Sequence, residues 1–229
     1  MKSLILLPGL LCDAALWQPQ SQALADSWQI AVPRLDAQDS LSALAAHVLA
    51  TAPSHFALAG LSMGGYVAME IMRQAPERVT RLALFDTSAR PDTPEQREKR
   101  QGLIRLSQTG KFKGVTPRLL PMLIHPAHLE NHTITEAILG MATRIGRAGF
   151  ERQQTAILGR VDSRPSLPAI RCPTLVVAGA YDQLTPPEIA HETAGLIPQA
   201  HLAIIPHCGH LPPLEQPERT TELLRHWLA

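Results

Sequence analysis

One short segment, residues 60–64 with the sequence GLSMG, limits the folds open to this chain more than any other part of it. It lies between an apolar run, 55–59, and a run of helix-forming residues, 66–74. A serine held exposed between a strand and a helix needs a very sharp turn, and the close backbone contacts of that turn require small flanking residues. The segment therefore predicts a strand, a tight turn and a helix, with Ser62 as a candidate nucleophile. A glycine-rich turn with a serine cap is the alternative that this pattern alone leaves open.

Further apolar runs of strand length recur along the chain and alternate with segments of helical periodicity. The runs expected to form strands are 3–7, 28–32, 55–59, 79–85, 174–178 and 201–205. The segments expected to form helices are 17–25, 41–50, 66–74, 94–108, 116–124, 133–158, 187–196 and 217–228. Runs that are apolar on both faces are typical of parallel strands covered by helices on both sides. This alternation predicts an α/β fold with a parallel, doubly wound sheet of about six strands.

One long segment, 91–165, interrupts the alternation because it contains no convincing strand. We expect helices there, with a break in the last of them near Gly146 or Gly149. The segment leaves and rejoins the sheet at the same edge, so we expect it to cover that edge as a lid. The predicted domains are an α/β core, 1–90 together with 166–229, and a helical cap or lid inserted into it, 91–165.

Three residues of complementary chemistry, Ser62, Asp182 and His210, each follow a predicted strand. Open parallel sheets bind ligands outside the carboxyl ends of their strands, so we expect these side chains at one edge. A serine hydroxyl needs a base to act as a nucleophile at neutral pH, and a histidine base needs a carboxylate to fix its tautomer. The three residues are therefore candidates for a catalytic triad. Asp86 also ends a strand near Ser62 and is a reserve candidate for the acid.

Three of these strand ends resemble motifs of the α/β-hydrolase superfamily, and the resemblance covers nearly the whole chain. Residues 60–65 look like that family's nucleophile elbow, 179–186 like its acid loop, and 208–210 like its histidine loop. The order serine, aspartate, histidine along the chain is also that of this family. The resemblance implies that Ser62, Asp182 and His210 are the nucleophile, the acid and the base.

The resemblance further implies an oxyanion hole made by the backbone N–H groups of Leu10 and Met63. Residues 8–10, Pro-Gly-Leu, stand where the family carries a His-Gly-x loop. Pro8 departs from that pattern, but the substitution leaves the N–H of Leu10 in place. A second departure is that no hairpin precedes the strand 3–7, so we expect a core without the antiparallel hairpin that usually begins this fold.

The activity implied by the resemblance is acyl transfer by a serine hydrolase that uses no cofactor. We expect a carboxylesterase that cleaves small or medium esters, or lactones, through an acyl-enzyme. Two alternatives stay open. The same triad is compatible with a lyase, a C–C bond hydrolase or a cofactor-free perhydrolase, and a ligand-binding member of the fold would need no turnover at all. Nothing in 91–165 carries a motif that identifies the substrate.

His125, His128 and His132 form an H-x2-H-x3-H pattern, which is a possible metal site. Proline interrupts the segment, and no cysteine ligand pattern lies nearby. Structural zinc sites normally combine such histidines with cysteines at regular spacing. We therefore expect exposed loop histidines and predict no metal.

The composition excludes several classes of partner. The formal net charge is +1, which gives no reason to expect nucleic acid or an acidic membrane surface. No segment approaches the roughly 18 apolar residues of a membrane span. The three cysteines, Cys12, Cys172 and Cys208, lack C-x-x-C spacing and suit a reducing cytosol, so we expect a cytoplasmic protein. The sequence makes no prediction of oligomeric state.

Overall fold

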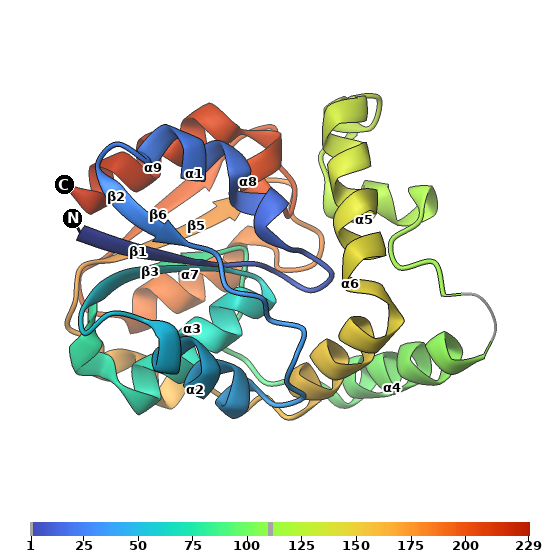
Figure 1. The fold of residues 1–229 in the computed structure, drawn as a ribbon, viewed down its shortest axis with the longest axis horizontal. Helices are drawn as coiled ribbons and strands as arrows, with labels where there is room; N and C mark the ends of the chain where they lie inside the picture. Colours follow the sequence, from blue (N-terminus) through green and yellow to red (C-terminus); the bar gives the residue numbers. More distant parts are fainter. Residues whose placement is uncertain (1, 110–111) are drawn as a thin grey trace.

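A six-stranded parallel sheet forms the centre of the computed structural model, which describes residues 2–109 and 112–229 (Figure 1). The strand order is β2-β1-β3-β4-β5-β6, and every neighbouring pair is parallel. The strands are β1 (Lys2–Leu7), β2 (Trp28–Ala31), β3 (Phe56–Leu61), β4 (Val79–Phe85), β5 (Thr174–Gly179) and β6 (Ala200–Ile205). The predicted fold class is thereby confirmed. Strand β1 begins at the first described residue.

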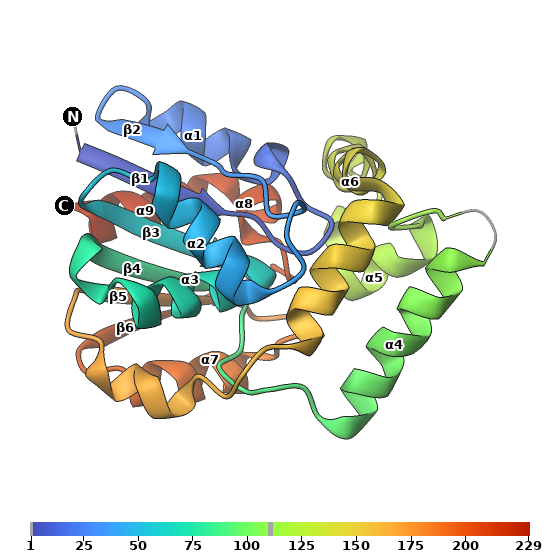
Figure 2. The same cartoon turned by 60° about the horizontal axis from the view of Figure 1, so that its bottom comes forward.

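Helices cover both faces of the sheet, which is why its central strands are apolar throughout. All six residues of β3 and of β5 are buried. One apolar cluster joins the sheet to α1 (Gln18–Leu24) and α9 (Pro217–Leu228). On the opposite face, the sheet packs against α2 (Leu41–Thr51), α3 (Met63–Gln74) and α7 (Pro187–Leu196). Figure 2 shows the two helical layers with the strands between them.

The segment between β4 and β5 contains only helices and turns in its described part. Its helices are α4 (Pro94–Gln108), α5 (Leu120–Leu123) and α6 (His132–Leu158), and its shorter turns are η3 (Pro117–Leu119) and η4 (Pro126–His128). These elements lie beyond the carboxyl ends of the strands (Figures 1 and 2). In the described chain, α6 included, no helix combines the length and apolar character that a membrane crossing requires. We call this segment, 91–165, the helical insertion.

The helical insertion was predicted to contain a helix over 116–124 and a break in its last helix. The helix predicted over 116–124 is confirmed over 117–123, where a 3-10 turn continues directly into a single turn of α-helix and Pro117 and Pro121 lie in their first turns. The break predicted in the last helix is confirmed at Gly146, where φ is 67° and ψ is −176°, well outside the helical range. At Gly149 a Cβ atom would lie 2.7 Å from Cγ2 of Ile145 and 3.2 Å from Cβ of Asp36, so a larger residue would be crowded there.

The remaining short elements are η1 (Ala14–Trp17), η2 (Pro76–Arg78), η5 (Arg164–Ala169) and α8 (Pro212–Glu215). None of these four was predicted as an element of its own, and α8 is notable among them because it follows the histidine loop directly. Its Pro-Pro start was a readable signal, because proline is favoured in the first turn of a helix.

The strand order creates a crevice at one point of the sheet edge. The chain runs from β1 outward to β2 and then returns to β3 on the other side of β1. The loops after β1 and β3 therefore diverge, and such a switch point is where open α/β sheets bind ligands. Here the loop after β1 carries Leu10, and the turn after β3 carries Ser62. The topology thus brings two regions that are far apart in the sequence to the same crevice.

Candidate active site

Ser62 occupies a strained turn between β3 and α3. Its φ is 53° and its ψ is −114°, a combination that L-residues rarely adopt. Two hydrogen bonds hold this backbone: the N–H of Ser62 donates to the carbonyl of Phe85 at 2.9 Å, and its carbonyl accepts from Oγ1 of Thr87 at 2.8 Å. Both partners come from the end of β4 and the loop that follows it. The neighbouring strand therefore stabilises the strained serine.

The flanking glycines are required by close backbone contacts. A Cβ atom on Gly60 would lie 2.3 Å from the carbonyl oxygen of Gly64. A Cβ on Gly64 would lie 2.3 Å from the carbonyl oxygen of Leu7 at the end of β1. Neither separation is sterically allowed, so any side chain would force the backbone apart. The sharp strand–turn–helix unit predicted from the sequence is present for the predicted reason.

His210 and Asp182 form a buried pair at the same edge of the sheet. Nδ1 of His210 lies 2.8 Å from Oδ2 of Asp182, and both side chains are almost completely inaccessible to solvent. The N–H of His210 also donates to the carbonyl of Leu123 in the helical insertion at 2.9 Å. A carboxylate in this position selects the imidazole tautomer that carries its proton on Nδ1, which leaves Nε2 free to act as a base.

The local hydrogen bonds of Asp182 favour its ionised form. Oδ1 accepts from the N–H groups of Leu184 and Thr185, and Oδ2 accepts from the Thr185 hydroxyl at 2.5 Å. Burial by itself would favour the neutral acid, but His210 and these donors outweigh it and hold the pKa of Asp182 below its usual value. Asp182 is therefore prepared to stabilise a positive charge on His210.

Asp86, the reserve acid, lies beside this pair without taking its place. The carboxylate oxygens of Asp86 and Asp182 and a ring nitrogen of His210 lie within 4.8 Å of one another. Oδ1 of Asp86 accepts from the N–H of Gly179 at 2.8 Å, while Oδ2 is buried with no hydrogen-bond partner in the described chain. Burial, reinforced by the negative charge of Asp182, raises the pKa of Asp86 well above its usual value. The two neighbouring carboxyl groups thus have opposite protonation preferences.

The backbone donors predicted for an oxyanion hole are unpaired in the described chain. Met63 is the first residue of α3, so its N–H has no acceptor within the helix. Neither this N–H nor that of Leu10 donates a hydrogen bond to another described residue. The loop carrying Leu10 lies next to the serine, because a Cβ on Gly9 would be 3.5 Å from Cβ of Ser62. Buried or half-buried N–H groups normally find a partner, so two free donors beside one serine are unusual.

The hydroxyl of Ser62 is likewise without a hydrogen-bond partner among the described residues, and the side chain is half-buried. Catalytic hydrogen bonds are often long or poorly aligned in unliganded proteins and tighten when substrate binds. The sheet edge at Ser62 therefore carries one hydroxyl and two N–H groups that have no partner in the described protein.

Glu215 shapes the histidine loop, and the sequence analysis did not identify it. This buried carboxylate accepts hydrogen bonds from the N–H groups of Gly209 and Leu211, on either side of His210, and from that of His125 at 2.7 Å. A buried carboxylate needs several donors to offset its desolvation. The sequence shows only a glutamate in a helix, so no local signal pointed to this role.

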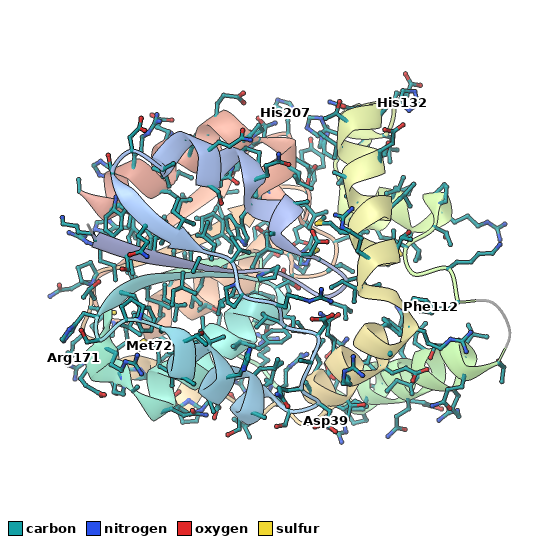
Figure 3. The ribbon with its side chains drawn as sticks, viewed as in Figure 1. Asp39, Met72, Phe112, His132, Arg171 and His207 are labelled. Atoms are coloured by element: carbon teal, nitrogen blue, oxygen red, sulfur yellow. The ribbon has the colours of Figure 1, made fainter. Side chains whose placement is uncertain are left out.

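Of the histidines considered as metal ligands, which were predicted to be exposed, His125 and His128 are half-buried and His132 is exposed. The ring of His125 contacts the rings of His128 and His207, with centroids 6.0 and 5.6 Å away. His132 belongs to the outer end of α6 (Figure 3). Across residues 2–109 and 112–229, the one group with at least three converging potential ligand atoms is Asp86, Asp182 and His210. These are the residues of the candidate acid–base pair and its neighbour.

Two cysteines lie near the site, and both are buried and free. Burial raises the pKa of Cys12 to about 12, and burial together with Glu215 raises that of Cys208. Since thiolates and not thiols are reactive, both behave as small apolar side chains. Cys12 also lines a cavity of about 750 Å³ between α1 and α6, but neither Ser62 nor His210 belongs to its walls.

The chain resembles known proteins in sequence and in fold. A sequence model of the alpha/beta hydrolase family matches residues 4–223. The chain is 27% identical to a pimeloyl-[acyl-carrier protein] methyl ester esterase of Nitrosomonas europaea, covering 94% of this chain and 91% of the relative. Among solved structures, a thermophilic esterase from Thermogutta terrifontis superposes with a TM-score of 0.88 at 33% identity, covering 100% of this chain and 89% of the other. The enol-lactonase from Burkholderia xenovorans LB400 has the same fold, with a TM-score of 0.87 at 23% identity over 99% of this chain and 91% of the other.

Proposed function

Because this chain belongs to the alpha/beta hydrolase family, we propose that it is a serine hydrolase that cleaves small or medium carboxylic esters, or lactones. The observation that carries the proposal is the buried pair of His210 and Asp182, 2.8 Å apart, at the sheet edge that also holds the strained Ser62. A neutral imidazole oriented by a carboxylate is the group that a serine needs in order to lose its proton at neutral pH.

In the proposed reaction, Oγ of Ser62 attacks the carbonyl carbon of the ester while Nε2 of His210 takes the hydroxyl proton. The imidazolium formed in this step is stabilised by Asp182, whose ionised form is favoured by its hydrogen bonds. The imidazolium then protonates the leaving alcohol, and an acyl-enzyme remains. Water deprotonated by His210 attacks the acyl group, and Ser62 recovers its proton when the acid leaves.

The negative charge that develops on the carbonyl oxygen would be held by the N–H groups of Leu10 and Met63. Their lack of any acceptor in the described chain supports this assignment, because a substrate oxygen would supply the missing partner. Backbone donors suit the task since they are already fixed before charge develops. The N-terminus of α3 adds a favourable helix dipole at the same place.

The ester substrate is supported by the relatives. The esterase of Nitrosomonas europaea acts on a methyl ester, and the Burkholderia enzyme is an enol-lactonase. We further propose that the helical insertion is a lid over a core domain made of 1–90 and 166–229. Its position beyond the strand ends, and the hydrogen bond from His210 to Leu123, support this role. Substrate selection would then depend mainly on residues of 91–165.

The proposal is tested with p-nitrophenyl acetate and butyrate and with a fluorophosphonate that labels active serines. We expect turnover of at least one ester, stoichiometric labelling of Ser62, and a loss of at least about 10⁴-fold in kcat for Ser62→Ala. Ser88→Ala, a serine in the loop after β4, is the control and should retain both labelling and turnover. Unchanged hydrolysis by Ser62→Ala would show that the nucleophile is wrongly assigned, and the absence of turnover and labelling in the wild-type protein would overturn the proposal.

A further inference from the structure

One buried side chain of the helical insertion is hydrogen-bonded directly to the loop that carries Leu10. Gln153 lies in the part of α6 after the Gly146 break and is completely inaccessible to solvent. Its Oε1 accepts from the backbone N–H of Leu11 at 3.0 Å, and its Nε2 donates to the carbonyl of Leu35 at 3.2 Å. The amide thus bridges the loops after β1 and β2, and both of its ends are paired.

The loop after β1 has a conformation that its own sequence does not favour. The N–H of Cys12 donates to the carbonyl of Gly9 at 3.1 Å, which closes a four-residue turn. Leu11, its third residue, has a φ of 58°, whereas Leu10 has no positive φ. This is the pattern of a type II turn, in which glycine or asparagine is preferred at the third position. Leucine there is strained, so something outside the turn must hold it.

Gln153 supplies the contact that distinguishes this turn from the commoner type I. The two types differ mainly by a rotation of about 180° of the central peptide group, here the one that joins Leu10 to Leu11. In the present turn the N–H of that peptide group points at Oε1 of Gln153. After rotation to type I, the carbonyl of Leu10 would face Oε1 instead, and two acceptors would meet in a buried site. The glutamine therefore selects the strained turn electrostatically.

Helix α6 also contacts these two loops in two further ways. Ala142, Ile145 and Phe150 form a buried apolar cluster with the side chain of Leu11. Nε of Arg152 donates to the carbonyl of Asp36 at 2.7 Å, next to the Leu35 carbonyl bound by Gln153. The apolar contacts fix where Leu11 lies, but they do not decide which way its peptide group faces. Among these contacts, that orientation depends on Gln153.

We infer that Gln153 is a positioning residue for the oxyanion hole: its hydrogen bond to the N–H of Leu11 holds the strained turn at the residue next to Leu10, and so keeps the N–H of Leu10 in place beside Ser62. The inference rests on the proposed function, since it assigns a role in the same reaction. It also means that the helical insertion does more than cover the site, because one of its side chains organises a donor that belongs to the core. Gln153 itself does not touch the reacting atoms.

Gln154 provides a matched control. It is the next residue on α6, is 2% exposed, and has its Oε1 bound by Arg100 at 2.9 Å, away from the loop after β1. We would measure kcat and KM for p-nitrophenyl butyrate, together with thermal unfolding, for Gln153→Met and Gln154→Met. For Gln153→Met we expect kcat to fall about 10- to 100-fold, less than the 10²- to 10³-fold loss of a whole donor, with KM changed by less than about threefold. For Gln154→Met we expect kcat within about twofold of wild type, even if both variants lose similar thermal stability.

A conservative variant separates hydrogen bonding from packing. In Gln153→Glu at pH 6, a buried neutral carboxyl accepts from Leu11 with one oxygen and donates to Leu35 with the other, so kcat should stay within about threefold of wild type. If packing alone mattered, both variants, which keep nearly the size of the glutamine side chain, would retain kcat. Should Gln153→Met not fold, Gln153→Ser with Gln154→Ser as its control tests the same difference in kcat.

The outcomes are distinguishable. If the wild-type protein turns over none of the esters and Ser62 is not labelled, the proposed function fails and the inference fails with it. If the wild-type protein is active but the two methionine variants lose kcat equally, or Gln153→Met keeps its kcat, the inference alone is overturned. A loss confined to Gln153→Met and restored by Gln153→Glu supports it.

Discussion

The two halves of the candidate site differ in how completely their polar groups are paired. On the acid–base side, Asp182 accepts four hydrogen bonds, from Leu184, from His210 and twice from Thr185. On the nucleophile side, the hydroxyl of Ser62 and the N–H groups of Leu10 and Met63 have no partner among the described residues. Proteins rarely leave such groups unpaired. The carboxylate of the acid–base half is therefore fully hydrogen-bonded before substrate binds, whereas the polar groups of the nucleophile half would gain their partners from the substrate.

Backbone strain, by contrast, is common to both halves. Five non-glycine residues of the described chain have a positive φ, and four of them follow strands at the site edge: Leu11, Ser62, Asp86 and His207. Each such conformation is unfavourable for an L-residue and persists only where surrounding contacts enforce it. In this protein the enforcing contacts include Gln153 for Leu11 and Thr87 for Ser62. Strain is thus concentrated where the orientation of a polar group matters.

The largest expected effect is on the paired side. Asp182→Asn replaces the acceptor of His210 Nδ1 with an amide that can donate, which favours the wrong imidazole tautomer. We expect kcat to fall about 10³- to 10⁴-fold with the fold retained, measured with p-nitrophenyl butyrate and circular dichroism. A loss of less than about tenfold would mean that Asp182 is not the acid and would direct attention to Asp86.

The next effect tests the unpaired side. Leu10→Pro removes the N–H proposed for the oxyanion hole, while proline is well suited to the second position of a type II turn. We expect kcat to fall about 10²- to 10³-fold with little change in KM. Leu10→Ala keeps the N–H and shortens the side chain, so it should lose much less. Equal losses in the two variants would contradict the assignment of this donor.

A smaller effect is expected from the residue that shapes the histidine loop. Glu215→Gln keeps the size of the side chain but turns one acceptor into a donor that faces backbone N–H groups. Losing a charged hydrogen bond in a buried site costs about 1.5–3 kcal/mol, so we expect a clear drop in the free energy of unfolding and about a tenfold fall in kcat. Urea titration and kinetics measure the two. Wild-type stability in this variant would show that the loop is held by other contacts.

The smallest effect on activity is expected at Asp86, where the change appears in stability instead. Because its pKa is raised in the folded protein, the unfolded chain loses this proton near pH 4 while the folded protein keeps it. The free energy of unfolding therefore falls as pH rises from about 4 through the raised pKa. Asp86→Asn should remove this loss of stability, so its gain in free energy of unfolding over wild type should be larger at pH 8 than near pH 4. Its kcat should stay within about threefold of the wild-type value.

Asp182 is the control for that experiment, because its contribution to stability should change with pH in the opposite direction. Its pKa is lowered, so its contribution to stability is present above the ordinary aspartate pKa and disappears as pH falls through the lowered value. Asp182→Asn should therefore be less stable than wild type at neutral pH, with the difference shrinking under acid conditions. Urea unfolding at pH 2.5, 4, 6 and 8 measures both variants. Parallel pH profiles for the two would contradict the opposite protonation preferences of the carboxyl pair.

Local sequence was sufficient to predict the sheet and the positions of Ser62, Asp182 and His210 at strand ends. Continuous apolar runs mark buried parallel strands, and the spacing of glycines marks a turn whose steric demands are local. The helical insertion was harder to predict. Its helices have less distinct periodicity, and the sequence pattern did not distinguish the 3-10 turn over 117–119 from the α-helical turn that follows it.

The roles of Gln153 and Glu215 could not be read from the sequence, because a buried amide or carboxylate is defined by partners far away in the chain. Gln153 is 142 residues from Leu11, and Glu215 is 90 residues from His125. The sequence by itself determined the kind of fold, the sharp turn at Ser62 and the chemical types at the strand ends, since these depend on steric limits and apolar patterning within a few residues. Only the tertiary structure decided which of two aspartates faces His210, which backbone donors stay unpaired and which side chain holds a strained turn, because those outcomes depend on distances and burial that arise when separate segments pack together.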